Sequence, residues 1–134
     1  MVGIKARSIS RGHASGEVLL SPAPIGFLGG VDPKTGNVIE KGHPLEGKCV
    51  AGKVLVFPNG KGSTVGSYVM LQLEKNGVAP AAIINTSAEP IIAVGAIISK
   101  IPMVDQPERD IYSLLKNKQK IIVDGTNGLI LVLE

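Results

Sequence analysis

Hydrophobic and polar positions follow their clearest pattern between residues 52 and 77, where two apolar stretches flank a glycine-rich turn. Residues 53–57 are apolar and partly β-branched, and the run is short enough to be a strand. Residues 65–73 repeat apolar positions at helical spacing, and Gly77 suits the left-handed position that ends a helix. The pattern therefore predicts a strand, a turn over residues 58–62 and a helix capped by Ser63 or Thr64.

Short apolar runs elsewhere predict further strands. They cover residues 3–10, 16–20, 81–85, 101–104, 120–123 and 129–133, the last two forming a hairpin. Residues 37–40 predict a weaker strand, and residues 49–51 are expected to extend the strand at 53–57 across a bulge at Gly52. Residues 11–13 read as a turn.

Two more helices are expected in the second half of the chain. Residues 91–98 are apolar on nearly every face, which predicts a short helix inside the protein. Ser87 is the expected cap of this helix, with Pro90 in its first turn. Residues 107–116 predict a surface helix that turns Ile111, Leu114 and Leu115 inward.

These elements predict a mixed α/β fold with a barrel-like sheet. About seven or eight short strands accompany two or three helices, with strands at both ends and βαβ units in the middle. A chain of 134 residues is long enough to bury a core and has the length of one domain. We therefore expect residues 1–134 to form a single domain.

Charge, aromatic content and cysteine content limit the classes of function that this protein can have. The net charge of +3 is mild and aromatic residues are 3% of the chain, which argues against a nucleic-acid surface and fits a small anionic substrate better. No apolar run approaches a membrane span, and no signal region opens the sequence. Cys49 is the only cysteine, so we expect no internal disulfide, no metal cluster held by this chain, and a reducing cytoplasm.

The turn at residues 58–64 carries the strongest chemical signal. A turn followed by a helix aims backbone N–H groups and a positive dipole end at one point, where an anion is favoured. Lys61, Gly62, Ser63 and Thr64 lie at that point. Neither the P-loop nor the dinucleotide fingerprint fits the spacing, so a tight turn with a capping serine is the alternative.

A second unusual stretch covers residues 25–36, with Gly29 and Gly30 followed by Asp32 in strong turn chemistry. Long loops in small domains are often functional, although a simple surface excursion remains the alternative. His13 and His43 fall in no catalytic triad, are expected at turns or on the surface, and make no zinc site with Cys49. The residues therefore give half of a site, which another chain would complete.

Four motifs give the chain a family resemblance. They are Gly29-Gly30-Val31-Asp32-Pro33-x-Thr35-Gly36, Phe57-Pro58-x-Gly60-Lys61-Gly62-Ser63-x-x-Gly66-Ser67, Pro80-Ala81-Ala82-Ile83 and Glu89-Pro90-Ile91. In this combination the chain resembles the small subunit of aconitase X over nearly its whole length, and it is most similar to the archaeal branch.

The resemblance implies a swivelling β/β/α domain that acts with a large subunit. In that family the large subunit holds an iron–sulfur cluster, expected to be [4Fe-4S], and this chain binds no cofactor alone. Ser63 corresponds to the proton acceptor. Lys61, Gly62, Thr64, Gly29, Gly30 and Asp32 are the expected substrate contacts.

The resemblance also implies a reaction. Archaeal members dehydrate (R)-5-phosphomevalonate to trans-anhydromevalonate 5-phosphate in a mevalonate route to isoprenoids, whereas bacterial relatives dehydrate cis-3-hydroxy-L-proline. The mildly basic chain suits the phosphorylated acid better. A swivelling phosphohistidine carrier and a non-catalytic partner-binding domain remain alternatives, although a carrier needs a histidine where this chain has Ser63.

Overall fold

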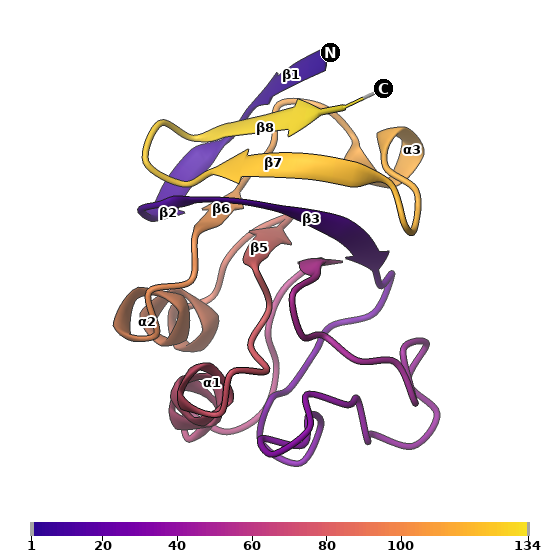
Figure 1. The fold of residues 1–134 in the computed structure, drawn as a ribbon, viewed down its shortest axis with the longest axis vertical. Helices are drawn as coiled ribbons and strands as arrows, with labels where there is room; N and C mark the ends of the chain where they lie inside the picture. Colours follow the sequence, from indigo (N-terminus) through magenta and orange to yellow (C-terminus); the bar gives the residue numbers. More distant parts are fainter. Residues whose placement is uncertain (1, 134) are drawn as a thin grey trace.

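The computed structural model describes residues 2–133, and one eight-stranded sheet organises them (Figure 1). The strands lie in the order β1-β8-β7-β3-β4-β5-β6-β2. Their bounds are β1 Val2–Lys5, β2 Arg7–Ser10, β3 His13–Leu20, β4 Val54–Phe57, β5 Ala82–Asn85, β6 Met103–Asp105, β7 Lys120–Asp124 and β8 Leu129–Val132. The helices are α1 Gly66–Lys75, α2 Pro90–Ile98 and α3 Ile111–Leu114. The mixed α/β class and the strand number are as predicted.

The sheet curls until its two ends meet. Strands β1 and β2 lie at opposite ends of the strand order, yet only Ala6 separates them in the chain. The prediction of one strand over residues 3–10 is therefore wrong. The chain bends at Ala6, whose N–H donates to the carbonyl of Gly128, so β1 pairs with β8 and β2 pairs with β6.

The middle of the sheet is parallel. Strands β3, β4, β5 and β6 run side by side in one direction, and α1 and α2 make the crossovers between β4, β5 and β6. Successive residues of β4 alternate between two cores, because Val54 and Val56 face into the curled sheet while Leu55 and Phe57 face the helices. Burial on both sides explains why these strands read as continuous apolar runs.

The inner core fills the curled sheet, and α3 closes it. This core gathers Ile4, Val18, Val54, Val56, Ala82, Ile84, Val104, Ile111, Leu115, Ile121, Val123, Ile130 and Val132. Helix α3 covers four residues instead of the ten predicted, and Asp110 begins it by accepting the N–H of Tyr112. Ile111 and Leu115 point inward as expected, while Leu114 is only half-buried.

The outer core lies between the parallel strands and α1, α2 and the long excursion at residues 21–53 (Figure 1). The excursion has isolated bridges instead of the predicted strand at 37–40: Val31 pairs with Val38, and Asn37 pairs with Cys49. Cys49 therefore does not extend β4, and Gly52 lies in a turn with a φ of 70°. The chain re-enters the sheet only at β4.

Helix α2 differs from its prediction on its outer face. Ile92, Gly95 and Ala96 are buried, but the side chains of Val94, Ile97 and Ile98 are 50%, 54% and 42% exposed. Its N-cap is Glu89 instead of Ser87, and Pro90 lies in the first turn as expected. Although every residue of α2 is apolar, residues 2–133 therefore bury only one side of the helix.

The ends of the other elements follow local chemistry. Gly77 follows α1 with a φ of 72°, which confirms the predicted left-handed end. The β7–β8 hairpin forms as predicted. His13 opens β3 by pairing with Asp124, so only Arg11 and Gly12 form the expected turn. No helix of the described chain is long and apolar enough to span a bilayer.

Candidate functional site

The candidate site lies where the parallel strands end. Strand β4 ends at Phe57 and β5 ends at Asn85, so the segments that begin α1 and α2 leave the sheet at the same edge. The two segments are tied together, because the N–H groups of Thr86 and Ser87 both donate to the carbonyl of Pro58. In parallel sheets this carboxyl edge is where ligands bind.

Ser63 is exposed at the start of α1. Its Oγ accepts the N–H of Val65 at 3.1 Å, and its carbonyl accepts the N–H of Gly66 at 3.0 Å. The helix begins one residue later than a Thr64 cap implies and two later than a Ser63 cap implies, because Val65 is the N-cap residue and has no side-chain cap. The Ser63 oxygen thus faces solvent with one backbone donor already directed at it.

Backbone donors remain available around Ser63. No hydrogen bond among residues 2–133 uses the N–H groups of Gly62, Ser63 or Thr64. Gly62 has a φ of 89°, a left-handed conformation that a glycine adopts without strain. Successive free N–H groups at such a turn, next to a helix N-terminus, favour bound negative charge.

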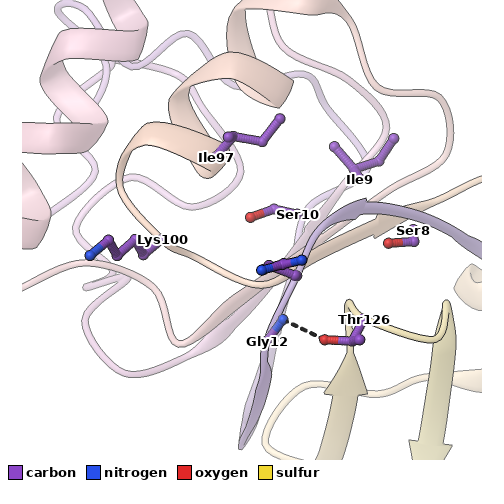
Figure 2. A pocket seen from close by; sticks show the side chains of 8 residues that line it. Ser8, Ile9, Ser10, Gly12, Ile97, Lys100 and Thr126 are labelled. Carbon is purple, nitrogen blue, oxygen red and sulfur yellow. Dashed lines mark hydrogen bonds between the residues drawn. The ribbon is translucent and has the colours of Figure 1, made fainter.

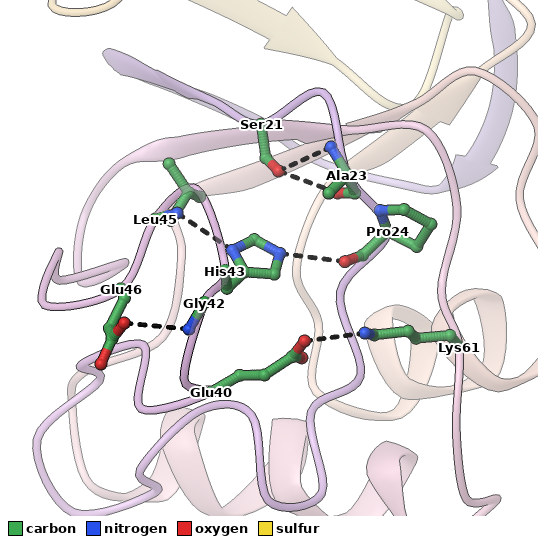
Figure 3. A network of polar contacts seen from close by, with 9 residues as sticks. All are labelled: Ser21, Ala23, Pro24, Glu40, Gly42, His43, Leu45, Glu46 and Lys61. Carbon is green, nitrogen blue, oxygen red and sulfur yellow. Dashed lines mark hydrogen bonds and ion pairs between the residues drawn. The ribbon is translucent and has the colours of Figure 1, made fainter.

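Lys61 belongs to the same turn, and its amine pairs with an acidic residue of the long excursion. Its Nζ lies 2.8 Å from Oε2 of Glu40 in the long excursion (Figure 3). The two side chains are 47% and 32% exposed, so solvent screens the pair and its contribution to stability is small. The ion pair instead fixes the direction of Lys61 and ties the turn to residues 37–42.

Gly26 links Gly30 to the turn through close backbone packing. A Cβ at Gly30 would lie 1.9 Å from the carbonyl oxygen of Gly26, and a Cβ at Gly26 would lie 2.9 Å from that of Lys61. Gly29 is exposed, has a φ of 77° and has no atom within 4 Å of its Cβ position. The glycine-rich loop is therefore stacked on the Lys61 backbone.

Asp32 lies at the other end of α1. Its carboxylate accepts the N–H of Lys34, and the neighbouring carbonyl of Pro33 accepts the side-chain amide of Asn76, the C-cap residue of α1. A ten-residue helix is about 15 Å long. The structure thus brings Lys61, Gly62, Ser63, Thr64 and the Gly29-Gly30 loop together and leaves Asp32 apart.

Two glutamates that the sequence did not single out as site residues help to shape the site. Glu40 binds Lys61, and Glu89 accepts the N–H groups of Ile91 and Ile92 at 2.9 and 2.7 Å. Glu89 also abuts Gly60, where a Cβ would lie 2.4 Å from its Oε1. An acidic residue before Pro90 and an apolar run was the available signal for Glu89, whereas nothing in the sequence links Glu40 to Lys61.

The histidines have structural positions. His43 is buried, with its Nδ1 accepting the N–H of Leu45 at 3.0 Å and its Nε2 donating to the carbonyl of Pro24 at 2.9 Å (Figure 3). His43 therefore lies at a turn, which is one of the two expected positions, but it is buried and its ring holds the excursion in place. His13 is exposed in β3. Neither residue starts α1 or α2, where a phosphohistidine carrier would need one.

The same strand edge holds a buried carboxylate. Asp105 is fully buried and accepts two hydrogen bonds from Arg7, at 2.8 and 2.7 Å, and one from the N–H of Ala88. This contact raises the pKa of Arg7. Asp105 thus joins β2 and β6 to the segment that begins α2. Within residues 2–133, no three His, Cys, Asp or Glu side chains are grouped to hold a metal ion.

Comparisons with known proteins agree on one family. The family model described as the aconitase X swivel domain matches residues 3–132. Phosphomevalonate dehydratase small subunits from Methanosarcina mazei and Thermococcus kodakarensis are 61% and 53% identical, covering 99% and 98% of this chain and 92% and 96% of theirs. The crystal structure of Thermococcus kodakaraensis aconitase X in its holo-form matches over the full length of both chains, with a TM-score of 0.94 and 51% identity. The chain therefore belongs to the aconitase X swivel-domain family.

Proposed function

We propose that this chain is the small subunit of a two-subunit hydro-lyase that dehydrates (R)-5-phosphomevalonate to trans-anhydromevalonate 5-phosphate. Relatives that are 61% and 53% identical over nearly the whole chain are named phosphomevalonate dehydratase small subunits. The mildly basic charge and the donor-rich turn both suit a phosphorylated acid. The proposal places the enzyme in the archaeal mevalonate pathway and in the cytoplasm.

The observation that carries the proposal is the N–H of Val65 directed at the Ser63 Oγ. Dehydration next to a carboxylate requires a base that removes the proton on the α-carbon. A serine can act as this base only if negative charge on its oxygen is stabilised. The Val65 N–H, 3.1 Å from Oγ, and the N-terminus of α1 both stabilise that charge.

The residues around Ser63 orient the substrate in this proposal. The free N–H groups of Gly62 and Thr64 bind a carboxylate or phosphate oxygen, and Gly26 lets the glycine-rich loop pack on the backbone of Lys61 without obstruction. The ion pair with Glu40 fixes the direction of the Lys61 amine, so a direct contact of this amine with the substrate stays a prediction. Contacts from Gly29, Gly30 and Asp32 to the substrate stay predictions, and the loop of Asp32 is anchored at the C-terminal end of α1.

The large subunit completes the site. Family membership implies a partner that carries an iron–sulfur cluster, and we place a [4Fe-4S] cluster entirely on that partner. When bound there, the cluster supplies a Lewis-acidic iron for the departing hydroxyl group. This chain contributes the proton acceptor and the anion-binding turn, and enclosure between the subunits excludes water and strengthens these interactions.

Replacing Ser63 by alanine tests the base directly. We expect Ser63→Ala, in complex with the large subunit, to lower kcat at least 100-fold, because general bases contribute roughly 10²–10⁴-fold. Its melting temperature and its affinity for the large subunit should stay near those of the wild type. Ser15→Ala, at an exposed position in β3, is the control and should leave kcat unchanged. More than a tenth of wild-type kcat in Ser63→Ala would exclude Ser63 as the base.

Substrate choice needs a separate assay. The reconstituted complex should turn over (R)-5-phosphomevalonate and should not turn over cis-3-hydroxy-L-proline, because a zwitterion places less negative charge at the turn. Turnover of hydroxyproline alone would reassign the substrate. It would not bear on the role of Ser63 as base, which the Ser63→Ala variant tests separately.

A further inference from the structure

A large open groove lies at the far end of α2 from Ser63. Its volume is about 960 Å³, and its walls come from α2, from β2 and the turn after it, and from the β7–β8 turn (Figure 2). Ile9 and Ile97 give it an apolar lining, and Arg11 and Lys100 are its charged residues. We call this cavity the α2–β2 groove.

The walls of the groove are fixed by hydrogen bonds. The N–H of Gly12 donates to Thr126 Oγ1 at 2.9 Å, which ties the β2–β3 turn to the β7–β8 turn (Figure 2). Ser10 Oγ approaches the carbonyl of Ala96 at 3.4 Å and links β2 to α2. These hydrogen bonds between its walls hold the groove in a defined shape.

The groove has an unbalanced charge. Among residues 2–133 no carboxylate lines it, and neither Arg11 nor Lys100 forms an ion pair there. Two cations above an apolar lining fit a segment that is apolar and carries a carboxylate.

Lys100 occupies a backbone conformation that usually belongs to glycine. Its φ is 57°, and the N–H groups of Lys100 and Ile101 donate to the carbonyls of Ile97 and Ala96. These two bonds make the helix-ending motif in which the left-handed position is most often Gly. A lysine is strained there, and strain of this kind clusters at functional sites.

The groove is joined to the candidate site along α2. This helix begins against the Ser63 turn, because Ile92 packs on Gly60, and it ends at the groove. Between these ends its outer face exposes Val94, Ile97 and Ile98 and carries no charged residue. A helix that is apolar all round is normally covered on every side.

We propose that the α2–β2 groove receives an apolar segment of the large subunit whose carboxylate side chain pairs with Lys100 and Arg11. The outer face of α2 continues the same interface toward Ser63. The inference rests on the proposed function only in requiring a large subunit, and it does not depend on the substrate or on the identity of the base.

Binding of purified chain variants to the purified large subunit tests the proposal. Lys100→Gly should weaken the affinity at least tenfold, while its melting temperature stays equal to or rises above that of the wild type because the strained residue is gone. Lys118→Gly is the matched control: Lys118 is exposed, has a φ of 70° and lies two residues before β7, at the opposite end of this strand from Thr126. It should bind within twofold of the wild type.

Ile97→Asp provides an independent test, since this half-exposed side chain contributes little to folding. It should also weaken binding at least tenfold. Wild-type affinity in both Lys100→Gly and Ile97→Asp would overturn the proposal, as would equal losses in Lys100→Gly and Lys118→Gly. Concentration-dependent dimers of the isolated chain that Ile97→Asp abolishes would assign the groove to a second copy. A wild-type complex that assembles with these affinities but does not turn over (R)-5-phosphomevalonate would count against the proposed function alone.

Discussion

Gly30 lies where the glycine-rich loop folds back on itself beside Lys61. Because its Cβ would lie 1.9 Å from the Gly26 carbonyl oxygen, any other residue forces the backbone to move. We expect Gly30→Ala to lower the free energy of unfolding by about 2 kcal/mol or more, within the range for overpacked sites. Urea unfolding measures this change.

Gly29→Ala is the matched control for Gly30→Ala. Gly29 has a φ of 77° but open space around its Cβ position, so alanine there should cost only about 1 kcal/mol for the left-handed backbone. Equal costs at both positions would show that the loop is held less tightly than its contacts indicate.

Tyr112 links stability to alkaline pH. Its hydroxyl donates to the carbonyl of Ser21 at 2.9 Å, and burial raises the pKa of Tyr112 above its ordinary value near 10. The fold thus favours the neutral ring, so this stability is present below pH 10 and is lost as pH rises through the raised pKa. Between pH 8 and pH 11 the wild type should lose more stability than Tyr112→Phe. Parallel losses in the two proteins would contradict this assignment.

Individual site residues were predictable where the chemistry is local. Gly62, Ser63 and Thr64 adjoin in the sequence, and a turn before a helix concentrates donors whatever the rest of the fold does. The partner of Lys61 could not be predicted, because Glu40 is 21 residues away and belongs to no motif. Asp32 was grouped with Ser63 by motif, but its loop is anchored at the other end of α1.

Among the elements, α2 depends on one capping side chain. Both carboxylate oxygens of Glu89 accept N–H groups of the first turn, and the negative charge is favoured at this helix end. Glu89→Ala should lower the free energy of unfolding by about 1–2 kcal/mol. Glu89→Gln, which keeps an oxygen acceptor and loses the charge, should lie between that variant and the wild type in chemical denaturation. An unchanged free energy of unfolding in Glu89→Ala would contradict the capping role.

The predicted boundaries of an element were wrong where the hydrophobic pattern continues although the backbone changes direction. Residues 3–10 keep one alternating pattern although the chain changes partners at Ala6, so periodicity alone could not reveal two strands. Helix α2 was expected inside because its residues are apolar, yet the side chains of Val94, Ile97 and Ile98 are exposed among residues 2–133. An exposed apolar helix face of this kind is typical of a subunit that is seen without its partner.

For the whole molecule, the parallel centre was predictable and the closure was not. Short strands joined by helices imply βαβ units, which place β4, β5 and β6 side by side. The pairing of Ile4 with Ile130 joins residues far apart in the sequence, and no local signal specifies it. The closure also brings Arg7 of β2 to Asp105 of β6, whose carboxylate accepts the N–H of Ala88 in the segment that begins α2.

The central claim is that this chain is the base-bearing half of a dehydratase. Titrating it into a fixed amount of the cluster-loaded large subunit, with (R)-5-phosphomevalonate as substrate and formation of the unsaturated product as readout, tests the claim most directly. We predict no turnover by either subunit alone and a rate that saturates at one chain per large subunit. Turnover by either isolated subunit, or a rate independent of this chain, would contradict the account.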